Sequence, residues 1–290
     1  MAEKTFGVLA PSTNTMVEPD FYMMGVPGVT AHLSRIYMAN TSRDRECVES
    51  TDQRQSRLEE EMKPTIKRIL TAEPDYMVMG MSAPTFRHGV EGNRRWKARM
   101  QEHSGGLGMA NGAEACERGL NALGVKRIGV LTPYWASTSS HVIRFFNEAG
   151  FEVVRHKDME CQSPVAIAHV EADEIRAALR KVDSGQVEAI VQCGTDLNFV
   201  ELADEADRWL GKPVLAINAV IWWMALRDND IQDKLYGYGR MLSDFQPAPN
   251  RSPHLKADVG DVNHRPCGAA MSGCLNPKYY LEEDHARSDY

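Results

Sequence analysis

Cys193 is the residue whose context most strongly suggests chemistry. It follows the apolar run VEAIVQ and precedes GTDL, so we expect its thiol at the end of a strand, beside the free N–H groups of the following turn. Such a position can lower the pKa of a thiol and orient it toward a ligand. The competing role is that of a buried cysteine acting only as a small hydrophobic side chain. Cys193 is therefore the first candidate catalytic residue.

Three further loops carry polar side chains suited to a carboxylate. Ser82 lies in GMSAP, which departs from the G-x-S-x-G elbow of serine hydrolases because Pro84 replaces the second glycine. We expect its hydroxyl to bind a ligand oxygen rather than to act as a nucleophile. Asn14 and Tyr134 each follow an apolar run and a proline, and both can donate to a carboxylate. Turn formation and local backbone bonding are the competing roles for these side chains.

The sequence lacks the usual signatures of cofactors and metals. The segment GLGMANG at 106–112 comes close to a dinucleotide-binding glycine pattern, but no ribose-binding acid follows on a second strand. No P-loop and no HExxH motif occurs. His254, His264, Cys267 and Cys274 fit the spacing of no standard zinc site. We expect an activity that needs neither metal nor cofactor.

These loops must be positioned by regular elements, and the hydrophobic pattern predicts which. Short apolar runs typical of strands occur at 6–10, 29–36, 76–79, 127–131, 152–155, 188–192 and 214–217. Between them, helical periodicity occurs at 51–72, 113–123, 139–149, 172–182 and 199–210. Strands that alternate with helices in this way predict parallel sheets covered by helices on both faces.

An internal repeat divides the chain. FGVLAP at 6–11 is similar to IGVLTP at 128–133, and MGMS and QCGT follow at nearly the same distance in each half. We predict an α/β protein of two pseudo-twofold-related, Rossmann-like halves with parallel sheets and the active site in the cleft between them. The predicted domains are 1–111, with a C-terminal segment as a candidate for exchange into it, then 112–245, and an irregular Pro-containing tail or oligomerisation arm at 246–290.

The amino-acid composition argues against some classes of binding partner. With 33 Lys and Arg against 40 Asp and Glu, the net charge of −7 and the lack of a basic cluster argue against nucleic acid. The six cysteines are scattered, which is typical of reduced thiols. No signal segment and no run of about 18 apolar residues occurs, so we expect a cytoplasmic protein without a membrane partner. The expected partners are a small mono- or dicarboxylic acid and a further copy of the chain.

The motifs, taken in order, resemble the aspartate/glutamate/hydantoin racemase superfamily, in the branch that contains arylmalonate decarboxylase and maleate cis-trans isomerase. The opening APSTNTMVEPD is similar to the maleate isomerase loop, in which the asparagine contacts a substrate carboxylate. MGMSAPTFRHG, NALGVKRIGVLTPY, QCGTDL and GYGRML are more similar to arylmalonate decarboxylase. The resemblance covers about Phe6 to Phe245.

The resemblance implies a site with a single thiol. Racemases and isomerases of the superfamily supply a cysteine from each half, but Gly80 stands at the first of these positions, as in the decarboxylase branch. The implied donors to the retained carboxylate are Ser82, Tyr134 and the N–H groups of Met81, Cys193 and Gly194. Met81 stands where the decarboxylase has a hydroxyl residue, so one side-chain donor is missing.

The predicted function is cofactor-independent decarboxylation of 2-substituted malonates or related small dicarboxylic acids, by way of an enediolate that Cys193 protonates. The alternative is a racemase or a maleate-type cis-trans isomerase, with a further base such as His88. A carboxylate-binding protein and a serine hydrolase are the remaining classes. The predicted catalytic residues are Cys193, Tyr134 and Ser82, and the predicted substrate-binding residues are Asn14, Gly80, Met81, Gly194 and Thr195.

Overall fold

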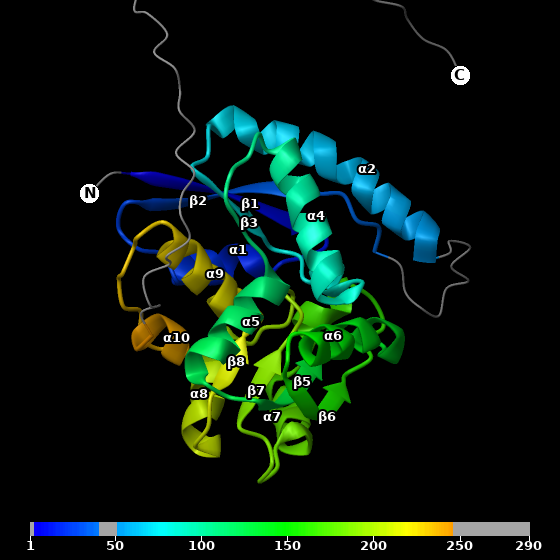
Figure 1. The fold of residues 1–290 in the computed structure, drawn as a ribbon, viewed down its shortest axis with the longest axis vertical. Coiled ribbons are helices and arrows are strands. Elements are labelled where there is room, and N and C mark those ends of the chain that lie inside the picture. The colour runs from blue at the N-terminus through cyan, green and yellow to red at the C-terminus, as the bar shows by residue number, and fades with distance from the viewer. Residues whose placement is uncertain (1–2, 41–50, 246–290) are drawn as a thin grey trace, which may run out of the picture. The chain divides into compact units, whose positions relative to one another are not determined.

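Two parallel sheets of the same topology form the framework of the protein (Figure 1). This computed structural model describes residues 3–40 and 51–245, with only the backbone for residues 51–55. One sheet contains β1 (Lys4–Pro11), β2 (Val29–Ile36), β3 (Tyr76–Met79) and β4 (Met109–Ala110), in the order β2-β1-β3-β4. The other contains β5 (Arg127–Thr132), β6 (Glu152–Asp158), β7 (Ala189–Gln192) and β8 (Val214–Ala216), in the order β6-β5-β7-β8. The predicted α/β class with two parallel sheets is confirmed.

The helices follow the strands in the alternation that the sequence predicts. They are α1 (Val17–Met23), α2 (Thr51–Ile69), α3 (Ala83–Phe86), α4 (Gly89–His103), α5 (Gly112–Leu123), α6 (Ala136–Glu148), α7 (Ala172–Val182), α8 (Val200–Leu210), α9 (Ile217–Asp228) and α10 (Arg240–Ser243). Short 3₁₀ turns lie at Leu70–Ala72 and Val165–His169. All five predicted helical stretches are present, whereas α1, α3, α4, α9, α10 and the short β4 were not predicted.

The last long helix connects the two halves. Although α9 directly follows β8 of the second sheet, it packs against α1, α5, β3 and β4 (Figure 1). Trp222 of α9 donates to the carbonyl of Met24 at 2.7 Å, and its ring stacks on Phe21 with the centroids 4.9 Å apart. One continuous hydrophobic core therefore includes side chains from both sheets.

Two sequence predictions are not tested by these features. The proposed divisions at residues 111 and 245 stay predictions. The tail at 246–290, with its proposed role in assembly, lies outside the described residues. Within the part of the chain that is described, no helix is both long and apolar enough to cross a membrane.

Candidate active site

Four of the predicted side chains lie in loops at the carboxyl ends of neighbouring strands. Asn14 follows β1 and Ser82 follows β3, and these strands pair in the first sheet. Tyr134 follows β5 and Cys193 follows β7, which pair in the second sheet. Because parallel strands end at one edge of their sheet, each sheet presents two of these loops side by side.

Thr195 joins the loops of the two halves. Its hydroxyl donates to the carbonyl oxygen of Gly80 at 3.0 Å and accepts from Asn14 Nδ2 at 3.2 Å. Asn14 Oδ1 in turn accepts from the N–H groups of Met16 and Val17 at 3.0 and 2.9 Å, which fixes the orientation of the amide. Thr195 and Asn14 are only 5% and 3% exposed, so these bonds form away from bulk water. The structure thus brings together Asn14, Gly80 and Thr195 from loops far apart in sequence.

Ser82 and Tyr134 form a second contact between the halves. Their hydroxyl oxygens lie 2.6 Å apart, and Ser82 is buried. The Ser82 carbonyl also accepts from the Thr85 hydroxyl at 2.6 Å, which closes the turn into α3. Burial raises the pKa of Tyr134 above its ordinary value, partly offset by the bond to Ser82. The phenol therefore stays protonated near neutral pH, and the two residues form a pair of neutral donors.

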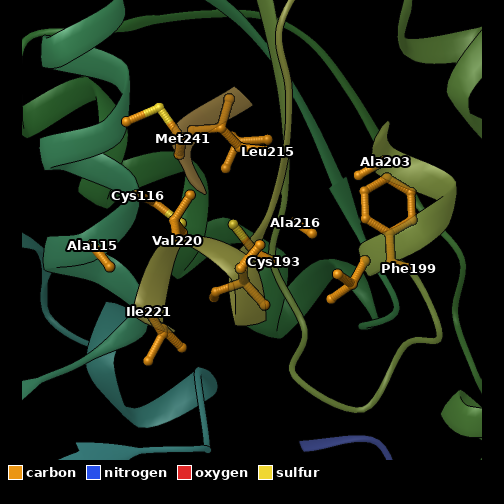
Figure 2. Close-up of a cluster of buried hydrophobic side chains, with 14 of the residues drawn as sticks. Ala115, Cys116, Cys193, Phe199, Ala203, Leu215, Ala216, Val220, Ile221 and Met241 are labelled. Carbon is orange, nitrogen blue, oxygen red and sulfur yellow. The ribbon is translucent and has the colours of Figure 1, made fainter. Parts of the chain in front are cut away.

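Cys193 lies in an apolar environment. Its side chain is fully buried, and Figure 2 shows it in the cluster that contains Cys116, Val220 and Leu215. Burial, with a further contribution from the neighbouring Cys116, raises the pKa of the Cys193 thiol well above its usual range. The pKa lowering that the strand end suggested is therefore wrong, because desolvation outweighs the local dipoles. The thiol is a neutral group near pH 7.

The backbone donors of the site differ from those implied by the resemblance. The Cys193 N–H bonds to the carbonyl of Leu131 at 2.9 Å as part of the sheet, so it is a structural donor and not a free one. Within residues 3–40 and 51–245, the N–H groups of Met81, Gly194 and Thr195 donate to no protein acceptor. These three N–H groups, with the Ser82 and Tyr134 hydroxyls, are the donors that the site offers a carboxylate.

Both glycines of the site are required by close packing. Gly194 has φ of +153°, and a Cβ added there would lie 2.4 Å from Pro133 Cδ. Gly80 donates its N–H to the carbonyl of Leu9 at 2.7 Å, and an added Cβ would lie 2.8 Å from Val17 Cγ1. The Val17 side chain of α1 therefore occupies the direction in which a side chain at position 80 would extend.

The sequence analysis did not identify a cluster of polar side chains that bonds to these loops, formed by Asp20, Asp196 and Asn218. Asp196 Oδ1 accepts from the N–H groups of Thr15 and Met16 at 2.8 and 3.3 Å. Asn218 Nδ2 donates to Asp20 Oδ2 at 2.7 Å and to the Thr195 carbonyl at 2.9 Å.

The two carboxyl groups in this cluster, those of Asp20 and Asp196, have shifted pKa values. Burial raises the pKa of Asp20 to about 7 and that of Asp196 to about 6. An available signal was the single amide of Asn218 in the otherwise apolar run AINAVIWWMAL.

His88 is the residue suggested above as a further base. It is exposed at the start of α4 with φ of 62°, and its ring centroid is 6.2 Å from that of His141. No hydrogen bond within the described residues connects it to Ser82, Tyr134 or Cys193. The same residues contain no group of three or more His, Cys, Asp or Glu side chains that could hold a metal ion. The tail residues His254, His264, Cys267 and Cys274 lie outside the described residues.

The chain is similar to known decarboxylases and isomerases of small carboxylic acids. A family model described as arylmalonate decarboxylase matches residues 71–242. A maleate isomerase from Nocardia farcinica (strain IFM 10152) is 24% identical over 251 residues, which is 83% of this chain and 96% of the relative.

Solved structures show the same fold. A Nocardia farcinica maleate cis-trans isomerase, with one cysteine changed to serine and a covalently bound succinylcysteine intermediate, superposes with a TM-score of 0.75 at 22% identity and covers 84% of this chain and 100% of that one. A crystal structure of arylmalonate decarboxylase gives a TM-score of 0.63 at 20% identity and covers 82% and 98% of the two chains.

Proposed function

Because this chain belongs to the arylmalonate decarboxylase family, we propose that it decarboxylates 2-substituted malonates or related small dicarboxylic acids without a cofactor. The observation that carries the proposal is the difference between the two halves. Cys193 follows β7, whereas Gly80 follows β3, and Val17 fills the space beside it. A single thiol can deliver a proton to one face of a planar intermediate, but it leaves no second thiol for the opposite face.

The donors support stabilisation of a developing dianion. When the carbon–carbon bond to the departing carboxylate breaks, its electron pair moves into the retained carboxylate to form an enediolate, and carbon dioxide leaves. Neutral donors that are already in place favour that charged transition state, and loss of one oxyanion-hole donor in an acyl-transfer enzyme costs about 3 to 4 kcal/mol. Ser82, Tyr134 and the free N–H groups of Met81 and Gly194 supply donors of this kind.

Cys193 then supplies the proton. Its S–H bond breaks as the α-carbon takes the proton, and the thiolate left behind recovers a proton from water. The raised pKa suits this role, since the group must be a thiol when the enediolate forms. Cys193, Ser82 and Asn14 are all buried, so the proposed reaction requires a rearrangement that admits the substrate.

Maleate-type cis-trans isomerisation is the second candidate. The buried Asn14, held by Thr195, supports it because the motif APSTNTMVEPD is similar to the isomerase loop. In the Nocardia isomerase structure a cysteine bears a covalent succinyl group even though another cysteine is changed to serine. The Gly80 position of this chain offers no thiol for such a bond, which favours the decarboxylase.

Proton NMR in deuterated water tests the proposal. The chain is incubated with 2-aryl- and 2-alkyl-malonates and, separately, with maleate. We expect a monoacid with one deuterium at the α-carbon and a single configuration, together with release of carbon dioxide. Conversion of maleate to fumarate without decarboxylation of any malonate would overturn the proposal in favour of the isomerase.

Cys193→Ala is the matching variant. It should lower turnover by at least about a thousandfold and keep KM within about tenfold, because it removes the proton donor but not the carboxylate donors. Cys161→Ala is the control, since that thiol lies after β6, outside the hydrophobic core cluster that contains Cys193. Near-normal turnover of Cys193→Ala would remove this residue from the mechanism.

A further inference from the structure

We propose that Asp196 is the positioning residue of this site: its carboxylate holds the turn that carries Asn14, so that the Asn14 amide is aimed at the substrate carboxylate. The inference rests on the proposed function for the substrate class, a small carboxylic acid, which the decarboxylase and the isomerase candidates share. It does not rest on it for the contact itself, which is a feature of the fold.

The contact is made by one short segment of the second half. Thr195 and Asp196 are consecutive, and each binds a different part of the same turn. The Thr195 hydroxyl accepts from the Asn14 side chain at 3.2 Å, and Asp196 Oδ1 accepts from the N–H groups of Thr15 and Met16. The segment therefore fixes both the backbone of the turn and the side chain that it presents.

Residues of the first half also bond to this turn. Arg35 Nη1 donates to the Asn14 carbonyl at 2.9 Å, and Asn14 Oδ1 accepts from the Met16 and Val17 N–H groups. Met16 N–H is thus shared between the Asn14 amide oxygen and the Asp196 carboxylate. Because the two acceptors share one donor, loss of the Asp196 bond should change the orientation of the Asn14 side chain as well as the conformation of the backbone.

The surroundings of Asp196 both raise and lower its pKa. Burial raises the pKa of Asp196, whereas the Thr15 and Met16 N–H groups and, to a smaller extent, His169 and Arg35 lower it. Asp196 in turn raises the pKa values of Asp20 and Tyr134, and Glu201 raises that of Asp20. The carboxylate therefore keeps its charge near neutral pH through its N–H donors and these two basic groups, and loses it in mildly acidic solution.

Two variants separate a positioning role from a purely structural one. Asp196→Ala removes both acceptor contacts, and we expect the dissociation constant for succinate, a dicarboxylate that cannot react, to rise at least about tenfold. KM should rise with it while kcat changes less than about threefold, because the proton donor is untouched. Asp196→Asn retains an acceptor oxygen, and it should restore binding to within about threefold of wild type at pH 8.

A double-mutant cycle adds a stricter criterion. If Asp196 acts through the turn, then Asn14→Ala with Asp196→Ala should bind succinate no more weakly than Asn14→Ala alone. Additive losses would mean that Asp196 acts on binding by some other route and would overturn the inference.

The pH dependence supplies a readout that does not depend on turnover. In amide NMR, the Thr15 and Met16 N–H signals of the wild type should shift with a midpoint near pH 6, and they should not do so in Asp196→Asn. The protonated Asp196 carboxyl keeps an acceptor oxygen, as Asp196→Asn does, so succinate binding by the wild type should stay within about threefold of that by Asp196→Asn as the pH falls through 6. Thr15 and Met16 signals that shift with the same midpoint in Asp196→Asn would contradict the proposal.

Glu188→Gln is the matched control. Glu188 also accepts from two backbone N–H groups, those of Lys126 and Arg127 at 2.7 and 2.9 Å, but at the start of β5. It should leave succinate binding unchanged. The outcomes separate the two proposals: a wild type that binds succinate through Asp196 but decarboxylates no malonate refutes the proposed function only. Normal decarboxylation with unchanged binding in Asp196→Ala refutes the positioning role only.

Discussion

At the scale of single residues, the candidate site presents a pair of neutral hydroxyl donors. The Ser82 and Tyr134 hydroxyls lie 2.6 Å apart, one from each half of the chain, and burial keeps the phenol protonated. A neutral pair can turn its hydrogens toward charge that develops on a carboxylate without binding the ground state as tightly as an arginine would. In the proposed reaction, such donors would stabilise the transition state more than the substrate.

Removal of either hydroxyl should therefore be costly for turnover. We expect Ser82→Ala and Tyr134→Phe each to lower kcat/KM by an amount equivalent to about 2 to 4 kcal/mol. Because the two hydroxyls bond to each other, the double variant should lose less than the sum of the single losses. Steady-state kinetics on the best malonate measures all three.

Tyr76→Phe is the control for this prediction. The Tyr76 hydroxyl donates to Asp228 at 2.6 Å, so the variant also loses a buried phenol bond, but outside the candidate site. Its stability should fall while its kcat/KM stays within about twofold of wild type. Unchanged kinetics in Ser82→Ala and Tyr134→Phe would return both residues to structural roles.

At the scale of elements, close packing constrains the turn after β7. Gly194 presents an unbonded N–H next to Cys193, and its backbone angle and the ring of Pro133 leave no room for a Cβ. The proline itself belongs to the turn after β5, the neighbouring strand. The two loops of the second half therefore determine each other's shape.

Gly194→Ala should destabilise the protein and displace the turn. Overpacking and a positive φ together should reduce the free energy of unfolding by about 2 to 4 kcal/mol. Urea unfolding measures this change, with Gly185→Ala as the control because a Cβ there meets nothing within 4 Å. Equal stability of the two variants would show that Pro133 and the turn can move apart without loss.

At the scale of the whole molecule, the junction of the two halves contains buried acids that oppose folding when ionised. Asp20 on α1 has a pKa of about 7 because of burial, and its partner Asn218 lies on α9. The unfolded chain releases this proton near the ordinary value of 3.8, whereas the folded chain keeps it until about pH 7. Between these values the folded state binds more protons, so its free energy of unfolding falls as the pH rises.

Asp20→Asn should remove this pH dependence. At pH 8 the variant should be more stable than the wild type by up to about 4 kcal/mol, and at pH 4 the two should be similar. Urea unfolding at both values measures the difference. Asp75→Asn is the control of opposite sign, because the hydrogen bond from the Thr5 N–H lowers the pKa of Asp75. Replacement of the Asp75 carboxylate should therefore bring no gain in the free energy of unfolding at pH 8. A pH-independent difference between Asp20→Asn and wild type would contradict the assigned pKa.

Helices with one apolar and one polar face could be predicted from the sequence. Long helices without this contrast could not. The stretch at 172–182 has one apolar and one polar side and became α7 with the predicted bounds. In contrast, α4 contains RRWKAR and few apolar positions, and α9 is buried on every side from Ile217 to Arg227. Neither pattern shows the contrast between faces on which prediction by period depends.

The sequence by itself determined the α/β alternation, the repeat, and the loops that carry Asn14, Ser82, Tyr134 and Cys193. These features are local, because a strand and the turn at its end lie within about ten residues of each other. Only the tertiary structure decided that Thr195 bonds to Asn14, that Asp196 holds the same turn, and that the Cys193 pKa is raised. Those properties depend on burial and on contacts between residues about 180 positions apart in the chain, which no local pattern of residue types encodes.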